Sequence, residues 1–328
     1  MLVGLVSITE GCNETGNSPD SPQRVIRVGM ALGRGGLGDR SFSDSAYEGL
    51  QRAQREFAIR SHVVDFQEGT DQVANLRALV GENHDLVIVL GQEYRSAIET
   101  LAPLYPEQHF AIIDAQVEAP NVTSVIFREL EGDFLAGALA ALLSEQNTVG
   151  FLGGADIDII RRIEHGWSQG VHHINPEAKI LVEYAGGIGD FSGFAKPELG
   201  RELTSKLYAQ QADVVYAAAG RTALGAIDAA QQQHKLVITT GSDQRWIAPG
   251  VVVASRTKNM DIAVYTLLNE YHQGILQAGT REIDLKSGGV SLTSLDSALI
   301  PTDVREQVRQ IQIKLINGDI AIQEYQAE

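Results

Sequence analysis

The chain has 328 residues, of which 44% are hydrophobic and 21% are charged, and it carries a formal net charge of −16 at pH 7. This length is sufficient for two domains with cores of their own. The acidic balance argues against sequence-independent binding to DNA or to anionic lipid, because both require a basic surface, so we expect no nucleic-acid partner.

Residues 1–23 resemble the start of a bacterial lipoprotein. Residues 1–8 are apolar, Gly11 precedes Cys12, and residues 13–23 form a polar stretch without a core-forming pattern. This order predicts a signal remnant, a lipid-modified Cys12 and a flexible tether. The two residues before Gly11 depart from the usual lipobox, which leaves a cytosolic protein with an incidental cysteine as the alternative. With one cysteine, an intrachain disulfide is excluded.

The stretch from Val25 to Phe57 predicts a strand, a glycine-rich loop and a helix. Four glycines free the loop backbone for tight or left-handed conformations, and they are Gly33, Gly35, Gly36 and Gly38. Apolar residues then recur at helical spacing from Phe42 onward, which predicts a helix that starts near Ser43. We expect this loop to border the opening of a site at the carboxyl end of the strand.

One interpretation of this loop is a dinucleotide site. Gly33, Gly35 and Gly38 match G-x-G-x-x-G, and Asp65 could be the carboxylate that binds a ribose. The function would then be that of an NAD-dependent oxidoreductase. The helix signals come several residues after the third glycine, however, and acidic residues of the loop add negative charge where a pyrophosphate must lie. This spacing disfavours the dinucleotide interpretation.

Further along the chain, strands and helices alternate twice. We expect strands over residues 62–66, 85–91, 110–114, 122–127, 149–152, 180–184, 214–218, 236–240 and 251–255. We expect helices over residues 72–80, 96–104, 131–143, 159–172, 197–208, 223–232 and 262–271, while residues 285–292 and a helix over 304–316 close the chain. This order predicts two doubly wound α/β lobes, whose ligands gather at the carboxyl ends of the strands.

Four segments resemble motifs of one family, the PnrA-like BMP family of basic membrane lipoproteins. Residues 39–49 (DRSFSDSAYEG) are similar to D-[KR]-S-F-N-x-x-[AS]-x-x-G, and residues 217–225 (AAAGRTALG) to A-A-A-G-G-T-G-L-G. The segment from Gly153 to Trp167 and the segment from Ser255 to Asp261 resemble two further motifs. The resemblance runs from about Val25 to the C-terminus.

The family consists of substrate-binding proteins of ABC transporters and includes purine nucleoside receptors. The resemblance therefore implies a type I periplasmic-binding-protein fold with a ligand cleft between the lobes. It implies one lobe of residues 24–126 plus about 257–281, and a second lobe of residues 127–256 plus about 282–328. It also implies a monomer without a cofactor, exported and lipid-anchored to the cell membrane, facing the periplasm or the exterior, which serves an ABC permease.

The resemblance also implies ligand contacts for individual residues. Phe42 would stack on a base, Tyr216 would be the second stacking aromatic, and Trp167 would wall the cleft from the second lobe. Asp114 would accept hydrogen bonds from a purine edge or a sugar diol, and Lys258 would reach ligand hydroxyls. Each residue also has a structural alternative: the three aromatics suit a core, Asp114 suits a helix cap, and Lys258 suits a solvated surface.

The chain departs from the nucleoside receptors at four positions. Gly33 and Gly241 stand where those receptors carry ligand-binding Asp residues, Arg221 stands where they carry Gly, and Arg34 where they carry an apolar residue. Two acceptors are thus lost and two guanidinium groups gained, which favours a modified or anionic ligand. Exposed loop positions for both arginines are the alternative. Two neighbours complete the candidate set, Ser41 and Asp243.

We therefore expect a substrate-binding lipoprotein of an ABC transporter that captures a purine nucleoside or a related aromatic heterocycle. The alternatives are an NAD-dependent oxidoreductase that uses the GRGGLG loop and a ligand-sensing domain of a signalling system. No catalytic or metal-binding residues are expected, because the eight histidines show no H-E-x-x-H spacing and the chain has no G-x-S-x-G motif.

Overall fold

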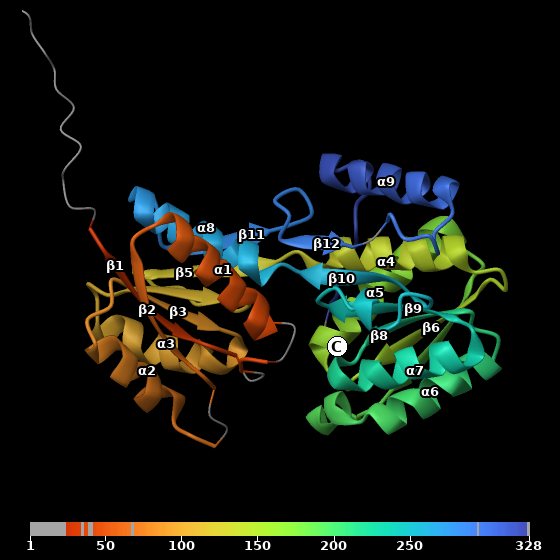
Figure 1. Cartoon of the computed structure of the whole chain (residues 1–328), viewed down its shortest axis with the longest axis horizontal. Coiled ribbons are helices and arrows are strands. Elements are labelled where there is room, and N and C mark those ends of the chain that lie inside the picture. Colours follow the sequence, from red (N-terminus) through yellow and green to blue (C-terminus); the bar gives the residue numbers. More distant parts are fainter. Residues whose placement is uncertain (1–23, 34–35, 39–41, 67–68, 294, 327–328) are drawn as a thin grey trace, which may run out of the picture.

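The computed structural model describes residues 24–33, 36–38, 42–66, 69–293 and 295–326. These residues form two α/β lobes, each built on a six-stranded sheet (Figure 1). The strand order is β11-β5-β4-β3-β1-β2 in lobe 1 and β12-β10-β9-β8-β6-β7 in lobe 2. All neighbouring strands are parallel except β12, which runs antiparallel to β10 at the sheet edge. The expected fold class, two doubly wound α/β lobes of type I periplasmic-binding architecture, is confirmed.

The strands of lobe 1 are β1 (Ile26–Ala31), β2 (Ile59–Val64), β3 (Leu86–Leu90), β4 (His109–Ile113), β5 (Val122–Phe127) and β11 (Gly279–Ile283). The strands of lobe 2 are β6 (Thr148–Gly153), β7 (Lys179–Tyr184), β8 (Val214–Ala218), β9 (Leu236–Gly241), β10 (Val252–Lys258) and β12 (Val290–Leu292). Central strands such as β3 and β8 are buried along their whole length, as expected for a parallel sheet covered on both faces.

Helices cover both faces of each sheet. Lobe 1 carries α1 (Phe42–Glu56), α2 (Gln72–Gly81), α3 (Arg95–Leu101) and α8 (Met260–Gln273). Lobe 2 carries α4 (Glu129–Leu143), α5 (Asp158–Ile174), α6 (Pro197–Ala209), α7 (Ala223–Gln233) and α9 (Thr302–Asn317). Among the described helices, none combines the length and the apolar character that a membrane span requires.

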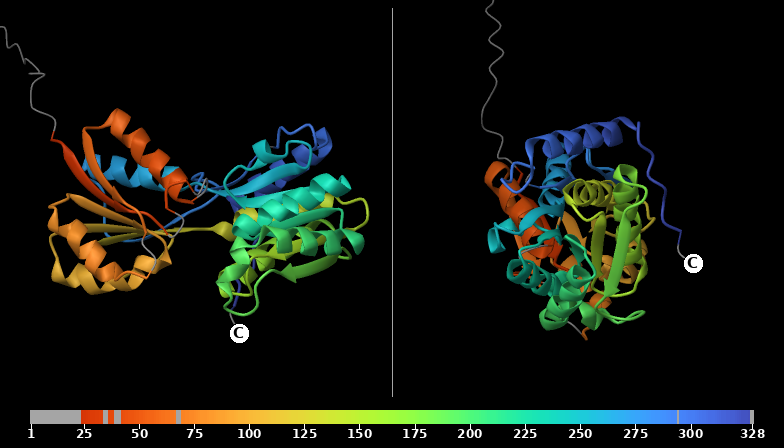
Figure 2. Two further views of the ribbon diagram at one scale, coloured as in Figure 1. Left: turned by 60° about the horizontal axis from the view of Figure 1, so that its bottom comes forward. Right: turned by 90° about the vertical axis from the view of Figure 1, so that its right-hand side faces the viewer.

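The chain passes between the lobes three times. The first passage leads from β5 into α4, the second from β10 into α8, and the third from β11 to β12. In the left view of Figure 2 these passages form a narrow link between the two lobes. The short strand β11 was not expected from the sequence, because its residues GTREI alternate weakly and lie at an exposed edge. The other expected strands and helices are present within a few residues of their predicted bounds.

Small residues let two pairs of helices approach closely. In lobe 2, Gly137 of α4 lies against the carbonyl of Trp167, and Gly170 of α5 lies against the carbonyl of Phe134. In lobe 1, Gly49 of α1 lies against the backbone of Asp261 at the start of α8. Each contact leaves no room for a Cβ atom, so the glycines set the distance between the helices.

We predict that Gly137→Ala destabilises the protein by about 1–3 kcal/mol, because the new methyl group would clash with the Trp167 carbonyl and push α4 from α5. Denaturant unfolding of the purified protein measures this loss. The matched control is Gly81→Ala at the end of α2, where an added Cβ meets nothing within 4 Å. We expect Gly81→Ala to be neutral or stabilising by up to about 1 kcal/mol. Equal effects of the two substitutions would contradict the close packing of α4 on α5.

Candidate functional site

Two cavities open where the chain passes between the lobes. The first, which we call the α1 cavity, has a volume of about 490 Å³ and is lined by Asp44, Ser45 and Glu48 of α1, by the loop after β9, and by Lys258. The second, the α4 cavity, has a volume of about 540 Å³ and is lined by the start of α4, by Asp114 and its neighbours, and by residues of α5. Both cavities therefore draw their walls from both lobes.

An ion cluster lies between the two cavities. Lys258 is the last residue of β10, and its Nζ atom lies 2.8 and 2.9 Å from the two carboxylate oxygens of Asp114 and 2.5 Å from Oε1 of Glu129. The side chains of Lys258 and Asp114 retain 11% and 23% of their exposure, whereas that of Glu129 retains 8%. Asp114 and Lys258, two ligand contacts that the family resemblance implied, are thus brought together between the interlobe cavities.

Burial and the neighbouring opposite charges shift the pKa values of these three groups in opposite directions. Burial raises the pKa of Asp114, and the charge of Lys258 offsets this rise only in part. Burial also raises the pKa of Glu129, but the charges of Lys258 and Arg256 outweigh it and hold that pKa below its ordinary value. Burial lowers the pKa of Lys258, and the two carboxylates reverse this into a net rise, so the lysine stays charged.

The backbone of Asp114 is unusual. Its φ angle is +68°, in the left-handed region that residues other than glycine rarely adopt. Its amide donates to the carbonyl of Val125 at 2.8 Å, which holds this conformation at the end of β4. Aspartate tolerates the left-handed region better than most residues. The conformation aims the carboxylate at Lys258 instead of at the cap of a following helix.

Aromatic rings flank the ion cluster on the side of lobe 1. The Lys258 ammonium lies 5.3 Å from the ring centre of Phe127 and 5.9 Å from that of Phe42. Phe42 is the first residue of α1 and is only partly buried. Its ring lies over Gly33, where an added Cβ would come within 3.1 Å of it. A side chain at position 33 would therefore displace the ring of Phe42, and the glycine keeps the ring beside the cluster.

Behind the cluster, a second charged group is fully enclosed in lobe 2. Arg256, two residues before Lys258, donates from Nε to Oδ1 of Asp133 at 2.7 Å, and the Tyr216 hydroxyl donates to the same oxygen at 2.6 Å. Burial raises the pKa of Asp133 to about 6 against the opposing charge of Arg256. Burial, with the negative charge of Asp133, also raises the pKa of Tyr216 well above its usual value. This group links α4, β8 and β10.

The structure corrects two of the predicted ligand contacts. Tyr216 and Trp167 are both 0% exposed and stack on each other with ring centres 6.0 Å apart and planes at 16°. Both rings belong to the core of lobe 2, where Phe151 also packs against them. A ring without exposed surface cannot stack on a ligand, so the expected clamp of Phe42 and Tyr216 is not formed. The structural alternative, a strand tyrosine packed under a helix, is correct.

Other predicted residues lie at the α1 cavity. Gly241 and Asp243 line it, with Gly241 at a φ of +100° and Asp243 held by Arg245 at 2.7 Å. Trp246, which follows in the same loop, also lines this cavity and is 62% exposed. Trp246 was not among the site residues predicted from the sequence. The sequence could have indicated it, because a tryptophan in a polar loop after the carboxyl end of β9 does not fit the pattern of a core residue.

Of the two predicted arginines, the structure describes Arg221, which is not part of an anion site. Arg221 is exposed in the short turn after β8 and lines neither interlobe cavity. Arg34, Ser41 and Cys12 lie outside the described residues. Among the described residues that line the α1 cavity, the acids are Asp44, Glu48, Asp261 and the Arg245-paired Asp243, and the base is Lys258. An acidic wall of this kind opposes an anionic ligand.

The glycine loop has partners other than a dinucleotide. The Asp65 carboxylate accepts from the Leu37 amide at 3.1 Å, and the Asp44 carboxylate accepts from the Gly38 amide at 2.8 Å. Loop amides that would bind a pyrophosphate are therefore bound to carboxylates of the protein itself. This arrangement does not favour the oxidoreductase interpretation.

Known proteins resemble this chain over nearly its whole length. The family described as ABC transporter substrate-binding protein PnrA-like matches residues 26–326. A CD4+ T-cell-stimulating antigen of Listeria innocua is 31% identical, covering 93% of this chain and 90% of the relative. Basic membrane protein A of Borreliella afzelii is 28% identical, covering 88% and 89%. An uncharacterized lipoprotein of Pyrococcus abyssi is 29% identical, covering 89% and 75%.

Solved structures share the arrangement of the two lobes. A solute-binding protein of an ABC transporter system from Aeropyrum pernix superposes with a TM-score of 0.79 at 26% identity, covering 92% of this chain and 94% of that one. A transcriptional activator of the comK gene from Bacillus halodurans has a TM-score of 0.77 at 22% identity, covering 90% and 99%. The second likeness shows the fold alone.

We predict that Arg256→Gln destabilises the protein by about 3–5 kcal/mol at pH 8, because the substitution leaves the buried Asp133 carboxylate without its cation. The loss of that charge also raises the pKa of Asp133 above its value of about 6. A carboxyl whose pKa is raised on folding stabilises the folded state at low pH and loses this contribution as the pH rises. The deficit relative to wild type should therefore shrink between pH 8 and pH 5.

Urea unfolding of both proteins across this pH range measures the effect. The control is Arg309→Gln, which removes an exposed ion pair with Asp296 and should cost at most about 1 kcal/mol at every pH. A deficit of Arg256→Gln that is small, or that grows as the pH falls, would contradict the buried network.

Proposed function

The chain belongs to the family of PnrA-like ABC transporter substrate-binding proteins, and we propose that it captures a purine nucleoside or a related aromatic heterocycle between its lobes. Its task is binding without chemical conversion of the ligand. A small-molecule ligand and a permease partner follow from the family. The nature of the ligand, the residues that bind it and the lipid anchor belong to our proposal.

The observation that carries the proposal is the arrangement around Lys258. Its ammonium group is bound to Asp114 and lies within about 6 Å of the ring centre of Phe42, at the meeting point of two interlobe cavities. A carboxylate and an ammonium group can serve the hydroxyls of a sugar, while an aromatic face serves a base. The combination of both beside one opening fits a nucleoside better than a purely aliphatic or purely charged ligand.

A neutral ligand fits the walls of the α1 cavity better than an anionic one. Of the carboxylates that line the α1 cavity, Asp243 is paired with Arg245, and those of Asp44, Glu48 and Asp261 repel anions; Arg221 lies away from both cavities. The polar groups of a nucleoside need hydrogen bonds but no countercharge. We therefore propose an uncharged heterocycle in place of the anionic ligand that Arg221 favours in the sequence.

Trp246 offers an exposed aromatic ring for the ligand, whereas the ring of Tyr216 is buried. It lies in lobe 2, is 62% exposed, and lines the α1 cavity together with Asp44 and Ser45 of lobe 1. In our proposal, Phe42 holds one face of the base and closure of the lobes brings Trp246 toward the ligand. Hinge closure about the three passages would then bury the ligand and present a closed face to the permease.

We predict that Phe42→Ala weakens the binding of the best nucleoside ligand by between about fivefold and 150-fold, because stacking on a base is worth about 1–3 kcal/mol. A thermal-shift panel of nucleosides, nucleobases, nucleotides and NADH identifies that ligand, and calorimetric titration then measures its affinity for wild type and variant. The control is Phe57→Ala, at the opposite end of α1, where the ring stacks on Tyr265 and His272. It should leave the affinity unchanged.

Several results would overturn this assignment. If no nucleoside or nucleobase raises the melting temperature, the ligand class is wrong. Saturable binding of NADH alone would support the dinucleotide interpretation instead. If Phe42→Ala binds the ligand as tightly as Phe57→Ala does, stacking on Phe42 is excluded.

We further propose that the protein is exported and anchored to the cell membrane by lipid on Cys12, as expected for a family with members named lipoproteins. We predict that the protein expressed from its native gene partitions into the detergent phase of Triton X-114, whereas Cys12→Ser partitions into the aqueous phase, because the thioether-linked lipid is lost. Immunoblotting of both phases measures this partition. Identical partition of wild type and variant would exclude the anchor at Cys12.

A further inference from the structure

Lobe 1 carries a group of potential metal ligands that is separate from the interlobe cavities. His62 of β2, Glu82 at the end of α2 and His84 before β3 place one ligand atom each so that all three lie within 4.8 Å of one another. We propose that these residues form a binding site for a transition-metal ion of the zinc type. None of the three lines the α1 or the α4 cavity, so the site is independent of the nucleoside proposal.

The geometry converges on one oxygen of Glu82. Its Oε2 atom lies 2.7 Å from Nδ1 of His62 and 3.1 Å from Nε2 of His84. Ligand atoms around a tetrahedral zinc ion stand about 3.3 Å apart, since the bonds to nitrogen and oxygen are about 2.0–2.2 Å long. Small rotations of the three side chains would therefore place a metal ion among them, in exchange for the two hydrogen bonds of the carboxylate.

The backbone is arranged to bring the three side chains together. Asn83 adopts a φ of +56°, and this left-handed turn brings Glu82 and His84 to the same side of the chain. Gly29 of β1 pairs with His62 in the sheet, and a Cβ at this glycine would come within 2.8 Å of the His84 ring. The absence of a side chain at position 29 thus leaves the space that His84 occupies next to β1.

The protonation states suit a metal ion. Burial lowers the pKa of His84, whose side chain is only 6% exposed, and thus favours the neutral imidazole that a metal ion requires. The hydrogen bond from His62 lowers the pKa of Glu82, which is therefore a carboxylate. Metal ligands must be in these deprotonated forms, and the ion would replace the proton that His62 shares with Glu82.

The donor set selects the kind of metal. Two imidazoles and one carboxylate suit zinc, copper, nickel or cobalt, whereas calcium and magnesium require several oxygen ligands. Arg27 adds a positive charge beside the cluster through its hydrogen bond to the Glu82 carbonyl. This charge further disfavours ions that are held mainly by electrostatic attraction, while coordination by nitrogen is less affected.

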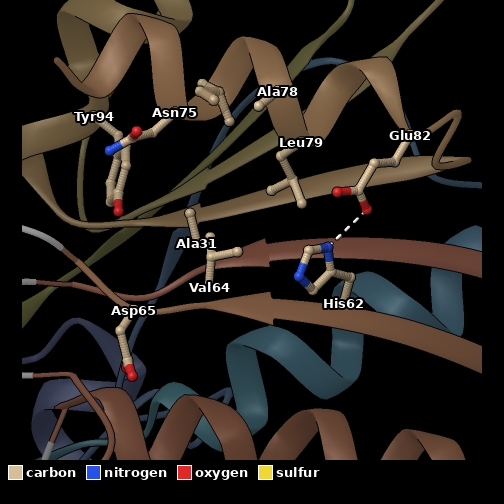
Figure 3. A pocket seen from close by; sticks show the side chains of 10 residues that line it. Ala31, His62, Val64, Asp65, Asn75, Ala78, Leu79, Glu82 and Tyr94 are labelled. Atoms are coloured by element: carbon tan, nitrogen blue, oxygen red, sulfur yellow. Dashed lines mark hydrogen bonds and ion pairs between the residues drawn. The ribbon is translucent and has the colours of Figure 1, made fainter.

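The site has an open side. His62 and Glu82 line a cavity of about 210 Å³ between β2 and α2, together with Val64, Asp65 and Leu79 (Figure 3). In Figure 3 the His62 ring and the Glu82 carboxylate point toward each other at one end of this cavity, whereas Asp65 lies at the far end. Water can complete the coordination from this side. The ion would join the outer strand β2 to the end of α2 and so stabilise lobe 1.

The test is a titration of the tag-free full chain carrying Cys12→Ser, so that the thiol does not contribute. After treatment with EDTA, ZnCl₂ is added in competition with a chromogenic zinc chelator. We expect one zinc ion per chain, unaffected by millimolar Mg²⁺ or Ca²⁺. His62→Gln should weaken the affinity more than about tenfold. His234→Asn, which replaces a histidine in a left-handed helix cap by a residue that tolerates this conformation, should leave it unchanged.

Thermal unfolding provides a second readout. Zinc should raise the melting temperature of the protein and of His234→Asn, but not that of His62→Gln or of a second variant, Glu82→Gln. The melting temperatures of all variants in EDTA show whether they fold. Failure of the parent protein to bind zinc more tightly than about 100 μM, or equal zinc binding by His62→Gln and His234→Asn, would overturn the proposal. Nucleoside binding is unaffected in either case, which separates this test from that of the proposed function.

Discussion

The need to compensate charges buried in strand β10 shapes the region between the lobes. Arg256 and Lys258 are two residues apart and therefore point to the same face of the strand. Three carboxylates meet them, Asp133 inside lobe 2 and both Glu129 and Asp114 where the chain passes between the lobes. Unpaired charges at these depths would be costly. The ends of β4 and β10 and the start of α4 are consequently held in one arrangement, and the two cavities open around it.

Most of the fold could be predicted from the sequence, because its signals are local and repeated. Unbroken apolar runs such as Leu86–Leu90 identify buried parallel strands, and their alternation with helical segments indicates a doubly wound sheet. Strand β11 was not predicted, because it lies exposed at the sheet edge and therefore lacks such an apolar run. Its place in lobe 1 depends on pairing with β5, a contact across more than 150 residues that no local pattern reveals.

The site was predicted less completely, because local patterns do not show which way a side chain points. Asp114 and Lys258 meet in the structure, although they are 144 residues apart. Tyr216 looked equally suited to a ligand and to the core, and its burial follows from the partners that Asp133 and Trp167 supply from other helices. The cluster of His62, Glu82 and His84 had no recognisable spacing, because it is assembled from strand β2, the end of α2 and the loop before β3.

The contact between α1 and α8 gives the first of these helices a mechanical role. The Asp261 amide donates to the Ser45 hydroxyl, and Gly49 seats the two helices backbone to backbone, one turn further along. Because α8 continues directly from β10, α1 is braced against the strand that leaves lobe 2. A displacement of the Phe42 ring, at the start of α1, would therefore be transmitted through α8 to the passage from β10 that joins the lobes. Binding of a ligand beside Phe42 and the angle between the lobes would then be coupled through the rigid contact between α1 and α8.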